Sequence, residues 1–178
     1  MNYCNLKKMD VANGVGIRVS LFVSGCLNKC EGCFNKEAWD FNYGDKYDDE
    51  VENEIIEALN SRLISGLTLL GGDPFEISNQ KDISKLLIKV KSLYPEKTIW
   101  AYTGYLLDCD LVEGGKRYCE YTNSIINNID ILVDGKFEIA KKNLSLSFRG
   151  SSNQRIIDMS VYHTNKTIID ISEQFDQR

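Results

Sequence analysis

The sequence of 178 residues contains little that marks linkers, membrane segments or secreted domains. It has two prolines and no apolar run near the roughly 18 residues that a membrane-spanning helix requires. Residues 1–8 lack the apolar core of a signal peptide. The 26 acidic residues outnumber the 21 basic ones, and the resulting charge of −5 does not favour nucleic-acid binding. We therefore expect a cytoplasmic protein of one main domain, without direct nucleic-acid or membrane partners.

Cysteine has the most informative distribution in the sequence. Six are present, and Cys26, Cys30 and Cys33 fall within eight consecutive positions as C-x3-C-x2-C. A disulfide framework spreads its cysteines through a secreted chain, whereas clustered cysteines without an export signal more often bind metal or do chemistry. The other three lack ligand-like spacing and are expected to be free thiols: Cys4, Cys109 and Cys119.

Three thiolates on one short loop are able to hold one metal centre. Structural zinc usually has four protein ligands, and no fourth ligand is near, because the only histidine is His163. Three cysteines suit a [4Fe–4S] cluster in which one iron has no protein ligand and is free to coordinate a substrate or cofactor. Two alternatives stay open, a zinc site completed by a distant ligand and a group of ordinary buried thiols.

Apolar periodicity predicts strands that alternate with helices. Runs of β-branched and aromatic residues predict strands, and helical spacing predicts helices. The expected strands are 17–24, 67–70, 98–103 and 129–133, and the expected helices are 51–63 and 79–94, the second ended by Pro95. Residues 105–128 are expected to form a loop and a helix, and three later runs are candidate strands: 144–148, 155–159 and 167–171. In residues 13–16 a glycine-rich stretch has no following helix and no suitable lysine, so it predicts a hairpin or tight turn rather than a phosphate loop.

The alternation indicates a largely parallel sheet with right-handed crossovers. Polar, glycine-containing clusters follow the four expected strands, at the edge where parallel α/β folds bind ligands. These clusters are Ser24-Gly25-Cys26, Gly71-Gly72-Asp73, Thr103-Gly104 and Asp134-Gly135-Lys136. A complete eight-unit barrel needs roughly 200 to 250 residues, so we expect a partial, laterally open β/α barrel of about five or six units.

The cysteine motif and its surroundings resemble a known family. C-x3-C-x2-C after a first strand is similar to the radical S-adenosylmethionine superfamily, in which most members carry an aromatic residue just before the last cysteine. Here Gly32 stands at that position and Phe34 follows the cysteine. This departure narrows the resemblance to one subgroup of the superfamily. The sequence resembles the activating proteins of anaerobic ribonucleoside-triphosphate reductases in eight segments: 1–3, 10–18, 21–26, 32–35, 71–74, 102–105, 132–137 and 149–154.

This resemblance implies two cofactors, a [4Fe–4S] cluster and S-adenosyl-L-methionine, and the residues that bind them. Cys26, Cys30 and Cys33 would ligate one [4Fe–4S] cluster, whose open iron binds S-adenosyl-L-methionine. The expected cofactor contacts are Asn35, Gly71, Gly72, Asp73, Thr103, Asp134 and Lys136. From the residues alone, a turn explains the Gly71-Gly72-Asp73 segment, an exposed turn explains Asp134 and Lys136, and a loop cap explains Asn35. Residues 149–154 are a candidate cofactor or partner contact, with a plain loop as the alternative.

The resemblance also implies the protein's activity and partners. The expected activity is reductive cleavage of S-adenosylmethionine with formation of a glycyl radical on anaerobic ribonucleoside-triphosphate reductase, with flavodoxin or a similar low-potential protein as electron donor. We expect residues 1–155 to form the partial-barrel domain and residues 156–178 to form an extension packed on it. The alternatives are an activase of a formate-lyase type enzyme, a radical enzyme for a small molecule, and a non-catalytic zinc-binding module.

Overall fold

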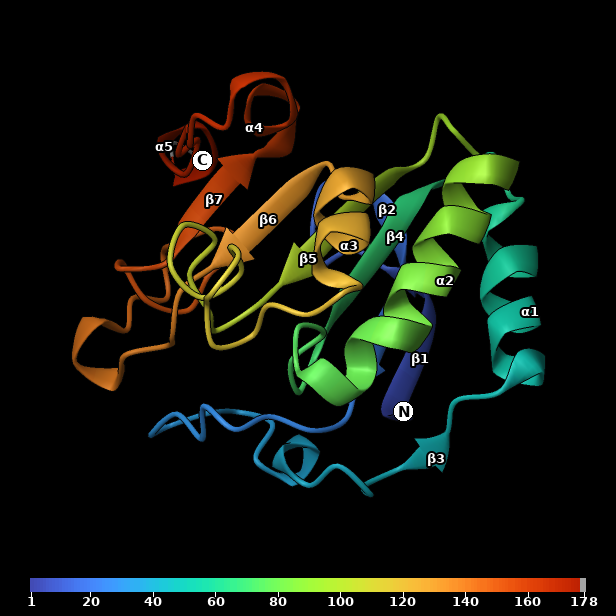
Figure 1. Ribbon diagram of the computed structural model, residues 1–178, viewed down its shortest axis with the longest axis horizontal. Helices are drawn as coiled ribbons and strands as arrows, with labels where there is room; N and C mark the ends of the chain where they lie inside the picture. The colour runs from blue at the N-terminus through green and yellow to red at the C-terminus, as the bar shows by residue number, and fades with distance from the viewer. Residues whose placement is uncertain (177–178) are drawn as a thin grey trace.

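Four parallel strands form the centre of the computed structural model, which describes residues 1–176 (Figure 1). β2 (Ile17–Val23), β4 (Ile64–Gly71), β5 (Thr98–Tyr102) and β6 (Ile131–Asp134) pair in this order. Their carboxyl ends therefore lie at one edge of the sheet, as the sequence predicts. The four polar clusters follow these ends and are brought to the same edge.

Three antiparallel strands extend this centre into a mixed, seven-stranded sheet. β1 (Asn2–Asp10) pairs with β2, β3 (Asp45–Lys46) pairs with β1, and β7 (Arg155–Asp158) pairs with β6. The order is β3-β1-β2-β4-β5-β6-β7, so the sheet is not closed. Residues 13–16 lie in the connection between β1 and β2, which confirms the predicted hairpin turn.

Three helices cover one face of the sheet: α1 (Asp49–Leu59), α2 (Ile77–Leu93) and α3 (Thr122–Asn128) (Figure 1). The Asp48 side chain caps α1 by accepting the backbone N–H groups of Glu50 and Val51. The main core lies between helices and sheet and includes Leu69, Ile99 and Leu86. The remaining helical segments are short: η1 (Glu37–Trp39), η2 (Ile139–Lys141), α4 (Met159–Asn165) and α5 (Glu173–Asp176).

A smaller apolar cluster lies on the opposite face of the sheet. Side chains alternate along a strand, so Ile99 and Ala101 of β5 join the main core while Trp100 and Tyr102 face the other way. Trp100 packs edge-to-face against Phe148 and Phe175, with ring centroids 5.2 and 5.9 Å away. The segment near the carboxyl terminus thus packs onto this face of the sheet.

Some predicted elements are wrong. Residues 144–148 form a loop, in which Leu144 is 89% exposed and Phe148 has a φ of 59°, and neither feature suits a strand. Residues 167–171 contribute only an isolated bridge between Ile157 and Asp170. α1 ends at Leu59, and Leu63 is exposed beyond it. β1 was not predicted, and half of the sheet's strand pairings are antiparallel, because both edges of the parallel centre are extended by neighbours in sequence.

Across residues 1–176, none of the helices is both long and apolar enough to cross a bilayer.

Candidate functional site

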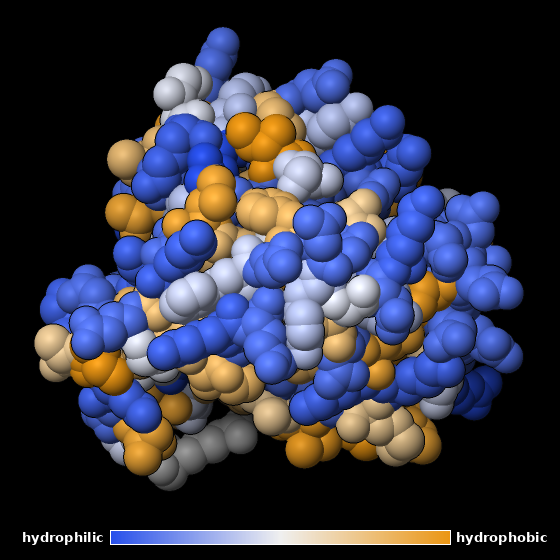
Figure 2. All heavy atoms as spheres, turned by 90° about the horizontal axis from the view of Figure 1, so that it is seen from below, coloured by the Kyte–Doolittle hydropathy of each residue, from blue (hydrophilic) through white to orange (hydrophobic). Residues whose placement is uncertain are grey.

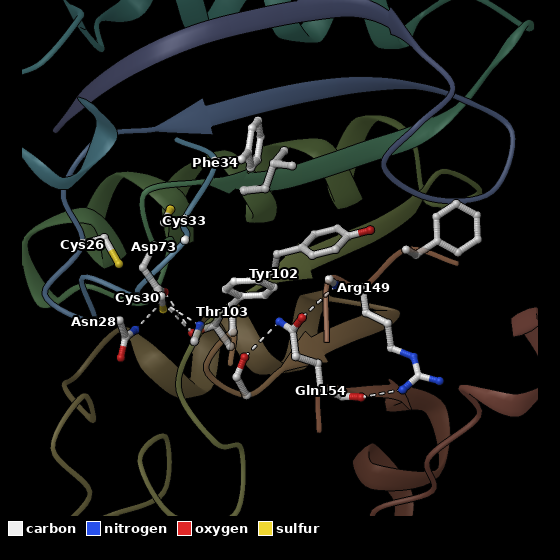
Figure 3. Close-up of a pocket in the computed structure, with 18 of the residues that line it drawn as sticks. Cys26, Asn28, Cys30, Cys33, Phe34, Asp73, Tyr102, Thr103, Arg149 and Gln154 are labelled. Atoms are coloured by element: carbon white, nitrogen blue, oxygen red, sulfur yellow. Dashed lines mark hydrogen bonds between the residues drawn. The ribbon is translucent and has the colours of Figure 1, made fainter. Parts of the chain in front are cut away.

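A cavity of about 590 Å³ lies at the carboxyl edge of the parallel strands. Its volume is in the range of sites for small molecules and cofactors. Seven of the ten predicted site residues line it: Cys26, Cys30, Cys33, Gly71, Gly72, Asp73 and Thr103. Figure 3 labels the three cysteines, Asp73 and Thr103. Three predicted site residues are not part of this lining: Asn35, Asp134 and Lys136.

The three cysteines of the motif lie on one loop that leaves β2 and is fixed at its base. The N–H of Gly25 donates to Ala38 O at 2.8 Å, and the N–H of Cys33 donates to Cys30 O at 3.1 Å. Burial raises the pKa of the Cys26 thiol to about 12, and the nearby Asp73 charge acts in the same direction. Burial also raises the pKa of Cys30. Both thiols are therefore protonated in the metal-free chain, and a metal must displace their protons when it binds.

The glycine pair after β4 allows the chain to approach the cysteine loop closely. Gly71 has a φ of 110°, which favours glycine. A Cβ atom on Gly72 would lie 2.5 Å from Gly25 O and 2.9 Å from Ala38 O. The N–H of Asp73 also donates to Gly25 O at 2.8 Å. The glycines thus join the end of β4 to the start of the cysteine loop, in addition to lining the cavity.

Asp73 connects three segments around the cavity. Its carboxylate accepts hydrogen bonds from the Thr103 hydroxyl and the Gly104 N–H, both at 2.9 Å, and from Asn28 Nδ2 at 3.3 Å (Figure 3). The side chain is 1% exposed, and burial raises its pKa to about 7, against the opposing effect of these donors. The carboxyl group therefore holds the cysteine loop, the β4 end and the β5 end together.

The other predicted contacts lie around the cavity rather than in its lining. Asp134 is fully buried, and its two oxygens accept from Arg155 at 2.8 and 2.6 Å. Lys136 is exposed, and its charge lowers the pKa of Cys30 against the larger effect of burial. Asn35 directs its Nδ2 toward the Cys4 thiol, 3.7 Å away.

The sequence analysis did not single out Tyr102, Phe34 or Leu144 as site residues, yet all three line the cavity. The Tyr102 hydroxyl is buried and has no hydrogen-bond partner among residues 1–176. Phe34 and Leu144 are 91% and 89% exposed, so the cavity reaches the surface beside them. Figure 2 looks onto the face that carries the cysteine loop and shows apolar side chains between hydrophilic ones. The available sequence signals were the alternation along β5 for Tyr102 and the place of Phe34 next to Cys33.

Residues 149–154 form part of one wall of the cavity, and hydrogen bonds fix the conformation of this loop. Gln154 Oε1 accepts from the N–H groups of Gly150 and Ser151, and its Nε2 donates to Gly135 O at 3.0 Å (Figure 3). Arg149 forms an ion pair with Asp176. The wall formed by this loop is therefore tied both to the end of β6 and to the carboxyl-terminal segment.

The donor set of the cavity fits an iron–sulfur cluster. The thiols of Cys26, Cys30 and Cys33 are free and line one cavity, and thiolates are the usual ligands of such clusters. Within the described part of the chain, no three His, Cys, Asp or Glu side chains form a preassembled metal site. The cysteine loop must therefore adjust when a metal binds, as is common when ligands are deprotonated on binding.

Comparisons with known proteins agree with this donor set. Residues 12–157 match the family model of a 4Fe-4S single cluster domain. A relative from Escherichia coli (strain K12) is 41% identical over 156 residues, which cover 86% of this chain and 96% of the relative. Relatives from Enterobacteria phage T4 and Haemophilus influenzae are each 40% identical over 158 residues, covering 88% of this chain and 93% and 97% of theirs. All three are named anaerobic ribonucleoside-triphosphate reductase-activating protein.

Proposed function

Because the chain belongs to the family of anaerobic ribonucleoside-triphosphate reductase-activating proteins, we propose that it is a radical S-adenosylmethionine activase that forms a glycyl radical on such a reductase. The observation that carries this proposal is the shared cavity. Three cysteines from one loop and the Gly71–Asp73 segment line it at the carboxyl edge of the parallel strands. This arrangement supports the proposal that a cluster and a small cofactor bind side by side in the cavity.

Cys26, Cys30 and Cys33 are the proposed ligands of the [4Fe–4S] cluster, with one iron left for S-adenosylmethionine. A bound, reduced cluster would supply the electron for reductive cleavage of S-adenosylmethionine, and together the two groups would supply the hydrogen-abstraction chemistry that the substrate glycine requires. The protein contributes position and electrostatics. Backbone carbonyls at Gly71 and Gly72 are proposed to accept from the methionine ammonium, which the partly ionised Asp73 attracts.

The other cofactor contacts are proposed with different roles. Thr103 lines the cavity and its hydroxyl donates to Asp73, which supports its proposed role as a direct contact of the cofactor. The exposed Lys136 is proposed to reach the carboxylate of S-adenosylmethionine. Asp134 and Asn35 require side-chain rearrangement to contact the cofactor. Asp134 now accepts hydrogen bonds from Arg155, and Asn35 is directed toward Cys4.

The open side of the fold suits a protein substrate. We propose that the four parallel strands and their helices form a partial barrel of the radical S-adenosylmethionine type within residues 1–155, with residues 156–176 packed on it; residues 177–178 of the predicted extension lie outside the described residues. The cavity reaches the surface beside Phe34 and Leu144, where a loop of the reductase is proposed to enter and exclude water. A flavodoxin-like protein is the proposed electron donor, since the remaining cysteines show no spacing for a second cluster.

Anaerobic reconstitution tests the ligand assignment and the chemistry together. The wild-type chain is expected to bind iron with acid-labile sulfide, and after reduction to release 5′-deoxyadenosine from S-adenosylmethionine. Cys30→Ser is expected to lose both properties because it removes one of three protein ligands. Cys109→Ser changes an exposed thiol and is expected to behave like the wild type. Zinc without iron in the wild type, or full activity in Cys30→Ser, would contradict the proposal.

A further inference from the structure

Glu76 directs its side chain away from the helix that it precedes. It occupies the N-cap position of α2, where a side chain usually accepts an N–H of its own helix, but it makes no such bond. Instead, Glu76 Oε1 accepts the backbone N–H of Leu27 at 2.7 Å. Leu27 lies inside the C-x3-C segment, directly after Cys26. Glu76 is 3% exposed, so a buried carboxylate is used to hold the cysteine loop.

A tyrosine and an arginine complete the surroundings of this carboxylate. The Tyr105 hydroxyl donates to Glu76 Oε1 at 2.6 Å, and Arg117 Nε lies 3.2 Å from Glu76 Oε2. The Arg117 guanidinium also lies 4.6 Å from the centre of the Tyr105 ring. Among residues 1–176, Glu76 thus has a neutral side-chain donor and one close positive charge, both from the segment after β5.

The position of Arg117 is itself fixed by contacts of its backbone. Its carbonyl accepts from Gln80 Nε2 of α2 at 2.7 Å, and its N–H donates to Asp110 O at 3.0 Å. Burying an ion pair gains little stability, because the desolvation cost offsets the attraction. Glu76 is buried and the Arg117 side chain is 17% exposed, so the pair is largely withdrawn from water, and it is better explained by its effect on the loop that Glu76 holds.

We propose that Glu76 and Arg117 are positioning residues, which hold the cysteine loop and balance the charge beside the cluster that it carries. The proposal rests on the proposed function for its second part only. Reduction adds one electron to the cluster, so a nearby carboxylate opposes reduction and a nearby guanidinium favours it. With both present, the two effects largely cancel.

The first part is tested in the metal-free chain by hydrogen exchange of the Leu27 amide. Glu76→Ala is expected to speed this exchange at least tenfold, because a hydrogen bond to a charged acceptor is lost. Glu76→Gln keeps an acceptor oxygen and is expected to restore most of the protection. Glu52→Ala breaks a comparable ion pair with Lys89 of α2 and is expected to leave the Leu27 amide unchanged. Unchanged exchange in Glu76→Ala, or equal loss in Glu52→Ala, overturns the positioning role whether or not a cluster binds.

The second part is tested by redox titration of the reconstituted chain. At a fixed potential, Glu76→Gln is expected to raise the ratio of reduced to oxidised cluster on the order of tenfold, or about 59 mV for one electron. Arg117→Gln is expected to lower it by a similar factor, and the double variant to return close to the wild type. Shifts of both single variants in the same direction, or of neither, would refute the charge balance. Failure of the wild type to bind iron would instead count against the proposed function.

Discussion

Asp73→Asn tests whether one buried carboxyl group controls how the stability of the metal-free chain depends on pH. Burial raises the pKa of Asp73 from 3.8 to about 7. As the pH rises above about 4, the unfolded chain loses this proton while the folded chain keeps it until about pH 7. The folded state then binds more protons than the unfolded state, so the contribution of Asp73 to stability falls with rising pH.

The size of this effect follows from the rise in pKa. At about 1.4 kcal/mol for each pKa unit, the full loss is on the order of 4 kcal/mol. About 2 kcal/mol of it falls between about pH 5.5 and about pH 8.5, a range above the sequence pI of 5.0. Asparagine does not titrate, so the wild type is expected to lose about 2 kcal/mol more than Asp73→Asn across this range.

Chemical denaturation at the two pH values measures this difference. Asp10→Asn is a matched control because Asp10 is also a buried, hydrogen-bonded aspartate. Burial raises its pKa, but the hydrogen bonds from Asn13 and its neighbours outweigh burial and lower it. Asp10→Asn is therefore expected to cost the same free energy at both pH values. Equal pH dependence in the wild type and Asp73→Asn would refute the assignment of a raised pKa to Asp73.

Two further substitutions test how the cavity is built. Gly72→Ala places a Cβ 2.5 Å from Gly25 O and is expected to cost about 1–3 kcal/mol in denaturation, with reduced iron content after reconstitution. An iron content equal to the wild type would show that the loop does not need this close approach. Phe175→Ala removes a half-buried ring that packs on Trp100 and Phe148 and is expected to cost about 2 kcal/mol. In Phe175→Ala, the backbone amides of residues 142–150 are expected to exchange faster than in the wild type. Unchanged protection of these amides would show that the carboxyl-terminal segment does not hold the cavity wall in place.

The chemistry-bearing parts of the site were predictable from sequence because they lie in short local patterns. C-x3-C-x2-C is read directly from its spacing, and the apolar runs of β2, β4, β5 and β6 are buried on both faces. β1 escaped prediction because it is largely polar and depends on its partner β2 for its conformation. The role of Glu76 was also not predictable from sequence, because its partners Leu27 and Arg117 are 49 and 41 positions away along the chain.

The conformation of the cavity wall formed by residues 142–150 was also not predictable from sequence, because it depends on contacts with distant residues. Residues 144–148 alternate apolar and polar side chains like a strand, but the Ser147 N–H donates to Asp176 and its hydroxyl donates to Phe175 O, and these contacts hold the segment as a loop. A pattern of period two predicts a strand only where a neighbouring strand is available for pairing. Here β7 pairs with β6, and most of residues 142–150 line the cavity.

The most direct test of the central claim is electron paramagnetic resonance of the partner. The reduced, reconstituted chain is incubated anaerobically with S-adenosylmethionine and an anaerobic ribonucleoside-triphosphate reductase. We predict a glycyl-radical doublet on the reductase with the wild-type chain and none with Cys30→Ser. Release of 5′-deoxyadenosine by the wild type without that doublet would contradict the assigned protein substrate.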